Sequence, residues 1–147
     1  MQKNKVFLDS SILITALLFS KGVSFYILTN LKDKFHFQIN DYVLEEILRV
    51  LDKKFSVKRK LKNYLFLLLG LAKVEILPLP SKASLKNVSK VLNKEDAIIL
   101  ASAVYNSNYL LTLDKDFLTE KVRNFAKNND CLILTPKEFI EDYLPND

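Results

Sequence analysis

Five short apolar runs, each separated from the next by helical segments, are the feature of this sequence that most restricts its fold. Most of them are continuously apolar rather than alternating, which is typical of strands buried on both faces of a sheet. The runs lie at 5–8, 35–39, 73–77, 109–113 and 131–134. Strands that alternate with helices form a mainly parallel sheet covered on both sides. The sequence therefore predicts an α/β fold with three layers, α/β/α, and a mainly parallel central sheet of about five strands.

Helices are predicted between and after these strands, from apolar periodicity and from residues that cap helix ends. They cover residues 10–19, 24–31, 42–53, 58–72, 94–107, 116–128 and 136–143. Thr135 is the predicted N-cap of the last helix, with Pro136 at its first position. Residues 81–92 are expected to form a polar connection. No linker, repeat or low-complexity tract interrupts the pattern, so a single domain over 1–147 is predicted.

The composition limits the class of protein. A hydrophobic share of 49% in 147 residues is enough for a packed core. The net charge of +5 fits a nucleic-acid partner, although it fits an ordinary soluble protein equally well. Cys131, the single cysteine, lies in an apolar run and is expected to be buried without a disulfide. The longest apolar segment, 64–72, is far shorter than the ~20 residues of a membrane helix. A cytoplasmic protein with no membrane contact is expected.

Acidic residues follow or precede several of the predicted strands. Asp9 comes directly after the first strand, Asp114 and Asp116 follow the fourth, and Asp96 begins the helix that leads into the fourth. Each of them could simply cap a helix. Because the carboxyl ends of parallel strands meet at one sheet edge, these distant acids could also lie together. Several carboxylates in one place repel each other, and a bound cation is the usual way of neutralising them.

Mg²⁺ or Mn²⁺ is the cation that suits such a site, because both ions prefer oxygen ligands. Zinc is not expected, since one cysteine and one histidine, His36, cannot build a typical zinc site. The predicted helix 42–53 adds two glutamates. Glu45 lies far from the apolar face and four residues before Arg49, which favours a surface ion pair. Glu46 lies at the margin of the buried face and is therefore the glutamate we expect to face the acidic cleft.

Four segments of the chain resemble the PIN domain family, which includes the VapC-type toxins of toxin–antitoxin pairs. They are "VFLDSSIL", "VLEEILRVL", "EDAIILASAVY" and "LLTLDKDFL", in that order over nearly the whole chain. The resemblance implies a metal-dependent ribonuclease whose catalytic and metal-binding acids are Asp9, Glu46, Asp96, Asp114 and Asp116. Asp116 would either hold a second metal or orient the attacking water.

The same resemblance assigns supporting roles to Ser11 and Thr112. Ser11 stands two residues after the first acid, where the family often has asparagine, and both residue types can hydrogen-bond a carboxylate or water. Phosphodiester hydrolysis on such a site needs no histidine base, because carboxylate-held divalent ions make water nucleophilic and stabilise the charge that develops at phosphorus.

A basic segment, 52–62, follows the helix that carries Glu46. Its cations are Lys53, Lys54, Lys58, Arg59, Lys60 and Lys62. They could hold RNA phosphates, with binding that weakens as salt rises. An ordinary solvated face is the alternative.

Two other classes of protein with a similar sheet fit the acidic residues less well than a nuclease does. A phosphatase of the haloacid dehalogenase type needs an aspartate where Ser11 stands, and a receiver domain needs an adjacent acidic pair that is missing. A PIN-like module that binds RNA or protein without cutting, and a housekeeping RNA-processing nuclease, stay open. The toxin reading implies an antitoxin partner. The apolar stretches at 12–19 and 64–69 are compatible with such a partner, with a homodimer or with simple core packing.

Overall fold

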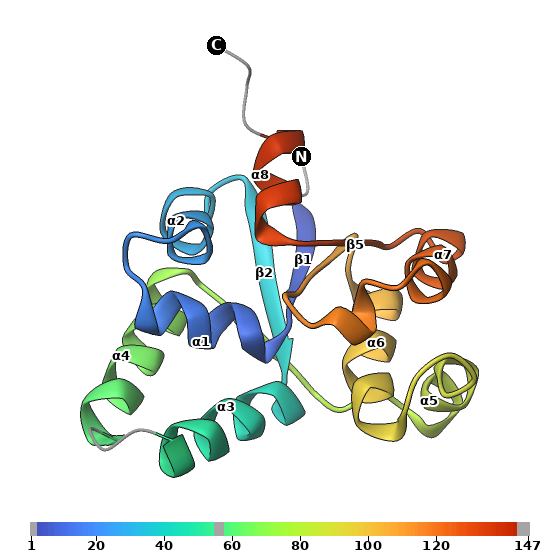
Figure 1. Ribbon diagram of the computed structural model, residues 1–147, viewed down its shortest axis with the longest axis horizontal. Helices are drawn as coiled ribbons and strands as arrows, with labels where there is room; N and C mark the ends of the chain where they lie inside the picture. The colour runs from blue at the N-terminus through green and yellow to red at the C-terminus, as the bar shows by residue number, and fades with distance from the viewer. Residues whose placement is uncertain (1–2, 55–57, 144–147) are drawn as a thin grey trace.

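The computed structural model describes residues 3–54 and 58–143, which form a parallel sheet with helices on both sides (Figure 1). The strands are β1 (Asn4–Leu8), β2 (Phe35–Asn40), β3 (Glu75–Leu77), β4 (Tyr109–Leu111) and β5 (Leu132–Leu134). The helices are α1 (Ser10–Leu18), α2 (Val23–Asn30), α3 (Asp41–Lys54), α4 (Lys58–Leu71), α5 (Lys82–Val88), α6 (Lys94–Asn106), the 3₁₀ turn η1 (Lys115–Phe117), α7 (Glu120–Asn128) and α8 (Pro136–Tyr143).

The sheet has the strand order β3-β2-β1-β4-β5, and every neighbouring pair is parallel. The chain moves from β1 toward β3 on one side and from β4 to β5 on the other. The direction therefore reverses between β1 and β4. Connections leave this point on opposite faces of the sheet, which opens a crevice beyond the carboxyl ends of the two strands. The predicted five-stranded parallel sheet is confirmed.

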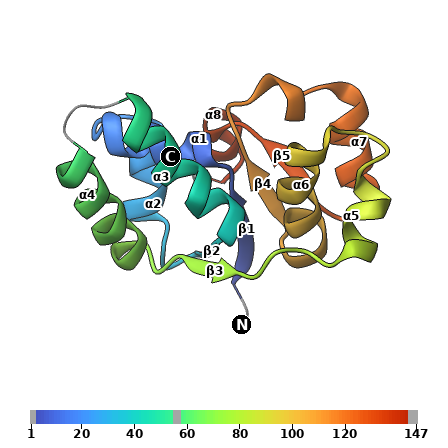
Figure 2. The same cartoon turned by 90° about the horizontal axis from the view of Figure 1, so that it is seen from below.

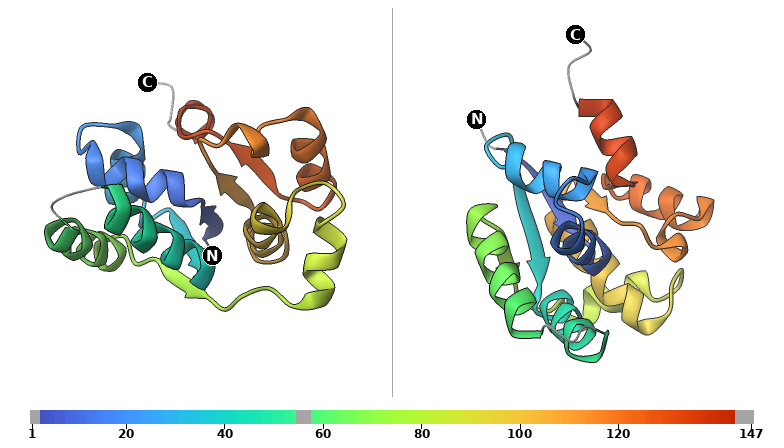
Figure 3. Two further views of the ribbon diagram at one scale, coloured as in Figure 1. Left: turned by 60° about the horizontal axis from the view of Figure 1, so that its bottom comes forward. Right: turned by 60° about the vertical axis from the view of Figure 1, so that its left-hand side comes forward.

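Two groups of helices enclose the strands. Figure 1 shows α1 to α4 on the left of the strands and α5 to α7 on the right, and Figure 2 and the left panel of Figure 3 show the same separation from other directions. β1 is buried between them, since Val6, Phe7 and Leu8 have no exposed surface. α6 packs on β1 and β4 with its small and apolar face, and α8 packs against α2 and β5. The three-layer prediction is confirmed.

Two predicted boundaries are wrong. The stretch 81–92 is not only a connection, because it contains α5, whose N-cap Ser81 accepts a hydrogen bond from the backbone N–H of Ser84. The helix predicted over 116–128 is split. Asp114 caps the short turn η1, and Thr119 then caps α7, which begins only at Glu120. In both places a small polar residue sets where a helix begins, and apolar periodicity does not mark that start.

Other local predictions agree with the structure. Thr135 begins α8 with a reciprocal capping box: its hydroxyl accepts from the N–H of Glu138 at 3.2 Å, and its own N–H donates to the Glu138 carboxylate at 3.0 Å. Cys131 is buried and free. Within the described ranges, no single helix is long and apolar enough to cross a membrane. α1 and α2 reach that length and hydropathy only as a pair bent by 99°.

Candidate metal centre

Asp9 stands at the end of β1, at the point where the strand order reverses. The register of the sheet pairs Leu8 with Leu111, so that Asp9 lies beside Thr112. The side chain is only 4% exposed. Its carboxylate accepts hydrogen bonds from the hydroxyls of Thr112 at 2.7 Å and Ser11 at 3.0 Å, and from the backbone N–H of Ser10 at 2.8 Å. Burial raises the pKa of Asp9 above its ordinary value, although these hydrogen bonds act in the opposite direction.

Thr112 and Ser11 tie the two neighbouring strand ends together. Thr112 is fully buried, and its hydroxyl oxygen also accepts from the N–H of Asp114 at 3.0 Å. The Ser11 hydroxyl oxygen accepts from the N–H of Leu113 at 3.1 Å. Both residues therefore hold the loop that carries Asp114 against the turn that carries Asp9. This placement agrees with the supporting roles expected for them.

Glu46 reaches the same place from the second turn of α3. The hydroxyl of Ser10 donates a short hydrogen bond to its carboxylate. Glu46 shares a cavity of about 340 Å³ with Asp9, Asp96 and Asp114, whereas Glu45 is exposed. The orientation of the two glutamates is thus the one expected from helical geometry. Ser10 was not identified from the sequence, because only the contact between α1 and α3 reveals its role.

Asp96, Asp114 and Asp116 form the other part of the site. Each offers a carboxylate oxygen, and these three atoms all lie within 4.8 Å of one another. Asp96 is partly buried in the first turn of α6, and desolvation together with the nearby Asp114 and Asp116 raises its pKa to about 6. The amide of Asn93, the N-cap of α6, donates to Asp96 at 3.1 Å and opposes that shift.

The acids also act as helix caps. Asp9 accepts from the N–H of Ser10 at the start of α1, and Asp114 accepts from the N–H of Asp116 in η1. The capping and clustering roles expected as alternatives are therefore both present. Capping uses part of each carboxylate and leaves further oxygen lone pairs free to face the cleft.

The donor set fits a hard divalent cation. The candidate ligand atoms are carboxylate oxygens, which Mg²⁺ and Mn²⁺ prefer. Burial, together with the neighbouring Asp114 and Asp116, raises the pKa of Asp96. Asp96 and Asp114 belong both to the cavity with Asp9 and Glu46 and to the close group with Asp116. The structure therefore places all five predicted acids around one site. Their roles as metal ligands stay predictions.

Asn40 is a second residue whose role the sequence analysis did not identify. It accepts from the N–H of Val43 at 2.9 Å and so begins α3. Its amide also donates to the hydroxyl of Ser102 in α6 at 2.8 Å, and both side chains are buried. This bond fixes the helix that carries Glu46 against the helix that carries Asp96.

The basic segment 52–62 lies at the far end of α3 and the start of α4. Lys62 pairs with Asp52 at 2.7 Å, and the Lys60 ammonium lies over the Tyr64 ring at 5.7 Å. Lys53 and Arg59 are exposed, and the side chains of Lys54 and Lys58 are outside the described residues. In the part of the chain that the structure describes, none of these cations lines the acidic cavity. Their contact with RNA stays a prediction.

The fold matches solved structures over most of their length. A chain of VapBC2 from Rickettsia felis, solved bound to a promoter DNA fragment, superimposes with a TM-score of 0.69 at 16% identity, covering 89% of this chain and 98% of that one. FitAcB from Neisseria gonorrhoeae superimposes with a TM-score of 0.62 at 20% identity, covering 90% of this chain and 98% of that one. PAE2754 from Pyrobaculum aerophilum superimposes with a TM-score of 0.63 at 16% identity, covering 86% of this chain and 95% of that one.

Comparison by sequence agrees with this fold. A search of curated protein sequences finds no match to the chain. Residues 6–121 match the family profile described as PIN domain, and this range contains all five acids of the cleft. The chain therefore belongs to the PIN domain family.

Proposed function

We propose that this protein is a ribonuclease that hydrolyses RNA phosphodiester bonds with the help of bound Mg²⁺ or Mn²⁺. The observation that carries the proposal is the convergence of acids from β1, α3, α6 and the loop after β4 at the crevice where the strand order reverses. Three of their oxygens lie within 4.8 Å, and no lysine or arginine pairs with them among the described residues. Such a charge distribution attracts a divalent cation rather than a phosphate.

Each acid has a distinct part in this proposal. Asp9 is a fixed ligand, because three hydrogen bonds hold its carboxylate. Glu46 is oriented by Ser10. Asp96 and Asp114 stand between these two and Asp116, which either holds a second ion or orients the attacking water. When bound, the cations supply activation of water and stabilisation of the charge at phosphorus.

The paired glutamates offer the sharpest test. We expect Glu46→Gln to weaken Mn²⁺ binding in calorimetry and to abolish cleavage of a mixed RNA pool. Glu45→Gln, one residue away on the exposed face, is the matched control and should leave both unchanged. If wild-type protein binds no Mn²⁺ and cleaves no RNA, the acids are only helix caps. The non-cutting binding module would then be the better account.

We further propose that the protein is the toxin of a toxin–antitoxin pair, acting in the cytoplasm. The resemblance to VapC-type toxins and the fold shared with chains of VapBC2 and FitAcB support this role. A housekeeping nuclease is the alternative. The two differ in their partners, because a toxin requires a protein that covers part of its surface.

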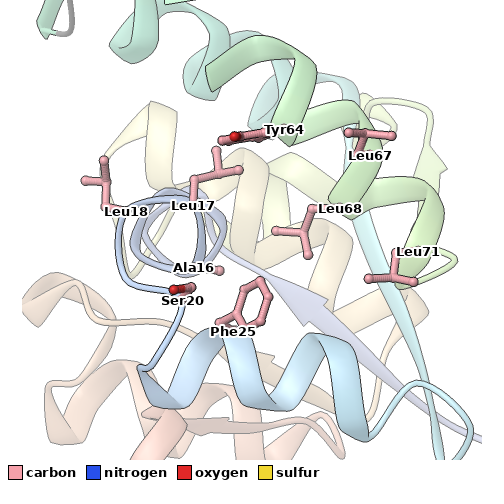
Figure 4. Close-up of a pocket in the computed structure, with 9 residues that line it drawn as sticks. All are labelled: Ala16, Leu17, Leu18, Ser20, Phe25, Tyr64, Leu67, Leu68 and Leu71. Atoms are coloured by element: carbon pink, nitrogen blue, oxygen red, sulfur yellow. The ribbon is translucent and has the colours of Figure 1, made fainter. Parts of the chain in front are cut away.

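An apolar groove between α1, α2 and α4 supports such a partner (Figure 4). Tyr64, Leu67, Leu68 and Leu71 lie on one face of α4 and turn toward Leu17 and Phe25. The groove measures about 540 Å³, and Leu67 is 68% exposed. An amphipathic antitoxin helix would bury this surface with its own apolar face.

Co-expression with the protein encoded beside this gene tests that assignment. We expect Leu67→Glu to dissociate the complex, whereas Leu79→Glu, an exposed leucine outside the groove, should leave it intact. Light scattering of the chain alone distinguishes the remaining case. A dimer that Leu67→Glu separates would make the groove a homodimer interface instead.

A further inference from the structure

A second hollow borders the acidic site. It measures about 580 Å³ and is formed by the turn between α5 and α6, by Asp96 and Asp116, and by the start of α7. These helices lie together on the right of Figure 1. Asp96 lines both this hollow and the cavity that holds Asp9 and Glu46. A chain that crosses the candidate metal centre could therefore continue directly into it.

Two cations stand in this hollow. Lys90 lies in the α5–α6 turn and Lys121 in the first turn of α7, and both are exposed. Neither has a carboxylate within 4.0 Å in residues 3–54 and 58–143. In the described part of the predicted segment 52–62, by contrast, Lys62 is paired with Asp52 and none of the cations lines the acidic cavity. RNA phosphates approaching a cluster of acids need positive charge close by, and these lysines provide it.

The remaining lining is partly apolar. Val91 and Leu92 are half-buried, and Val122 is buried. The polar groups of Asn93 and Thr119 are already used as helix caps, toward Asp96 and Val122. The hollow thus offers cations and an apolar surface but few free groups for reading base edges. An unpaired nucleotide matches this combination, because its charged phosphate and apolar base face are both accessible, whereas duplex bases are stacked inside the helix.

We infer that this hollow binds an unpaired nucleotide of single-stranded RNA next to the cleaved bond. Lys90 and Lys121 hold its phosphate, and Val91 and Leu92 contact its base. The inference rests on the proposed ribonuclease function and adds to it the path that the substrate takes on one side of the metal centre, with the residues that line this path. It also implies weak base preference at this position.

The test compares two pairs of exposed lysines from α5, the turn that follows it and α7. The first variant is Lys90→Gln/Lys121→Gln, and the matched control is Lys86→Gln/Lys127→Gln, two exposed lysines outside the hollow. Binding of a fluorescent single-stranded RNA is measured by anisotropy in EDTA at several salt concentrations. The slope of log affinity against log salt should fall by about 0.7 in the first variant, which loses the contact with one phosphate, and should be unchanged in the control.

Steady-state cleavage in Mn²⁺ provides the second readout. We expect the KM of the first variant to rise about tenfold with little change in kcat, since the contacts precede chemistry. Equal slopes and equal KM values in both variants would overturn the inference about the hollow. The ribonuclease proposal would still stand if the wild-type protein cleaves RNA. RNA binding that depends on Lys90 and Lys121, without any cleavage, would support nucleotide binding in this hollow and overturn the ribonuclease proposal. Duplex RNA that competes as well as a single strand would overturn the assigned strandedness.

Discussion

The two parts of the acidic site are held in different ways. Asp9 is buried, and hydroxyl and backbone donors surround its carboxylate, while Glu46 receives the Ser10 hydroxyl. Asp96, Asp114 and Asp116 are less buried than Asp9, and their carboxylate oxygens lie within 4.8 Å of one another. The first part is organised by the protein alone. The second carries repulsion that a bound cation would relieve, which makes it the part where ion binding and stability should be most closely linked.

Replacing Asp96 should have the largest effect. Asp96→Asn removes the proposed ligand that both parts of the site share. Mn²⁺ affinity and RNA cleavage should therefore each fall at least about 100-fold, which is the upper range for losing a residue that only orients a ligand. Calorimetry and a cleavage assay measure the two quantities. Asp33→Asn, an exposed acid elsewhere, is the control. Normal affinity in Asp96→Asn would mean that the repulsive part does not bind the ion.

Thr112→Val tests the part that the protein organises. The buried carboxylate of Asp9 would lose its shortest hydrogen bond and the N–H of Asp114 its acceptor. We expect the free energy of unfolding to fall by about 2–3 kcal/mol, because hydrogen bonds to buried charged groups contribute more than neutral ones. Thr29→Val, whose hydroxyl bonds only to groups within its own helix, should cost less than about 1 kcal/mol. Urea unfolding distinguishes these results.

The pH dependence of stability should separate the two parts further. The pKa of Asp96 in the folded protein is about 6, against an ordinary value of 3.8. Its contribution to stability is therefore fully present below about pH 4 and is lost as pH rises through about 6. Allowing for solvent screening of a partly exposed group, metal-free protein should lose about 1–2 kcal/mol across this window. Urea unfolding in EDTA should show a larger loss in wild type than in Asp96→Asn, where Asp9, whose pKa is also raised, still contributes, and Mn²⁺ should reverse the loss.

The smallest effect is expected for Ser10→Ala. The variant removes the donor that orients Glu46, but Glu46 is partly solvated and can find water instead. Stability should change by less than about 1 kcal/mol, while the cleavage rate should fall about tenfold through poorer orientation of the glutamate. Kinetics and unfolding measured on one preparation test this, with Thr15→Val as a helix control. A change in stability without a change in rate would show that Ser10 acts only in packing.

Part of the fold was predictable because its signals are local. Apolar runs bounded by polar residues marked all five strands, and helical spacing oriented Glu45 and Glu46 correctly. The signal failed for α5 and for the break at residues 115–119, where capping residues rather than apolar periodicity set the helix ends. The roles of Ser10 and Asn40 were also missed. Each depends on a partner 36 or 62 residues away, to which no local pattern points.

The sequence by itself determined the alternation of strands and helices, the acids at the strand ends and the family to which they belong. These follow from hydrophobic periodicity and from motifs within a few residues. Only the tertiary structure decided that β1 and β4 are neighbours and that Asp116 and Lys121 line one hollow beside Asp96. The same holds for the absence of Lys53, Arg59, Lys60 and Lys62 from the lining of the acidic cavity. These facts depend on strand order and helix packing, which bring together side chains that lie far apart in the sequence.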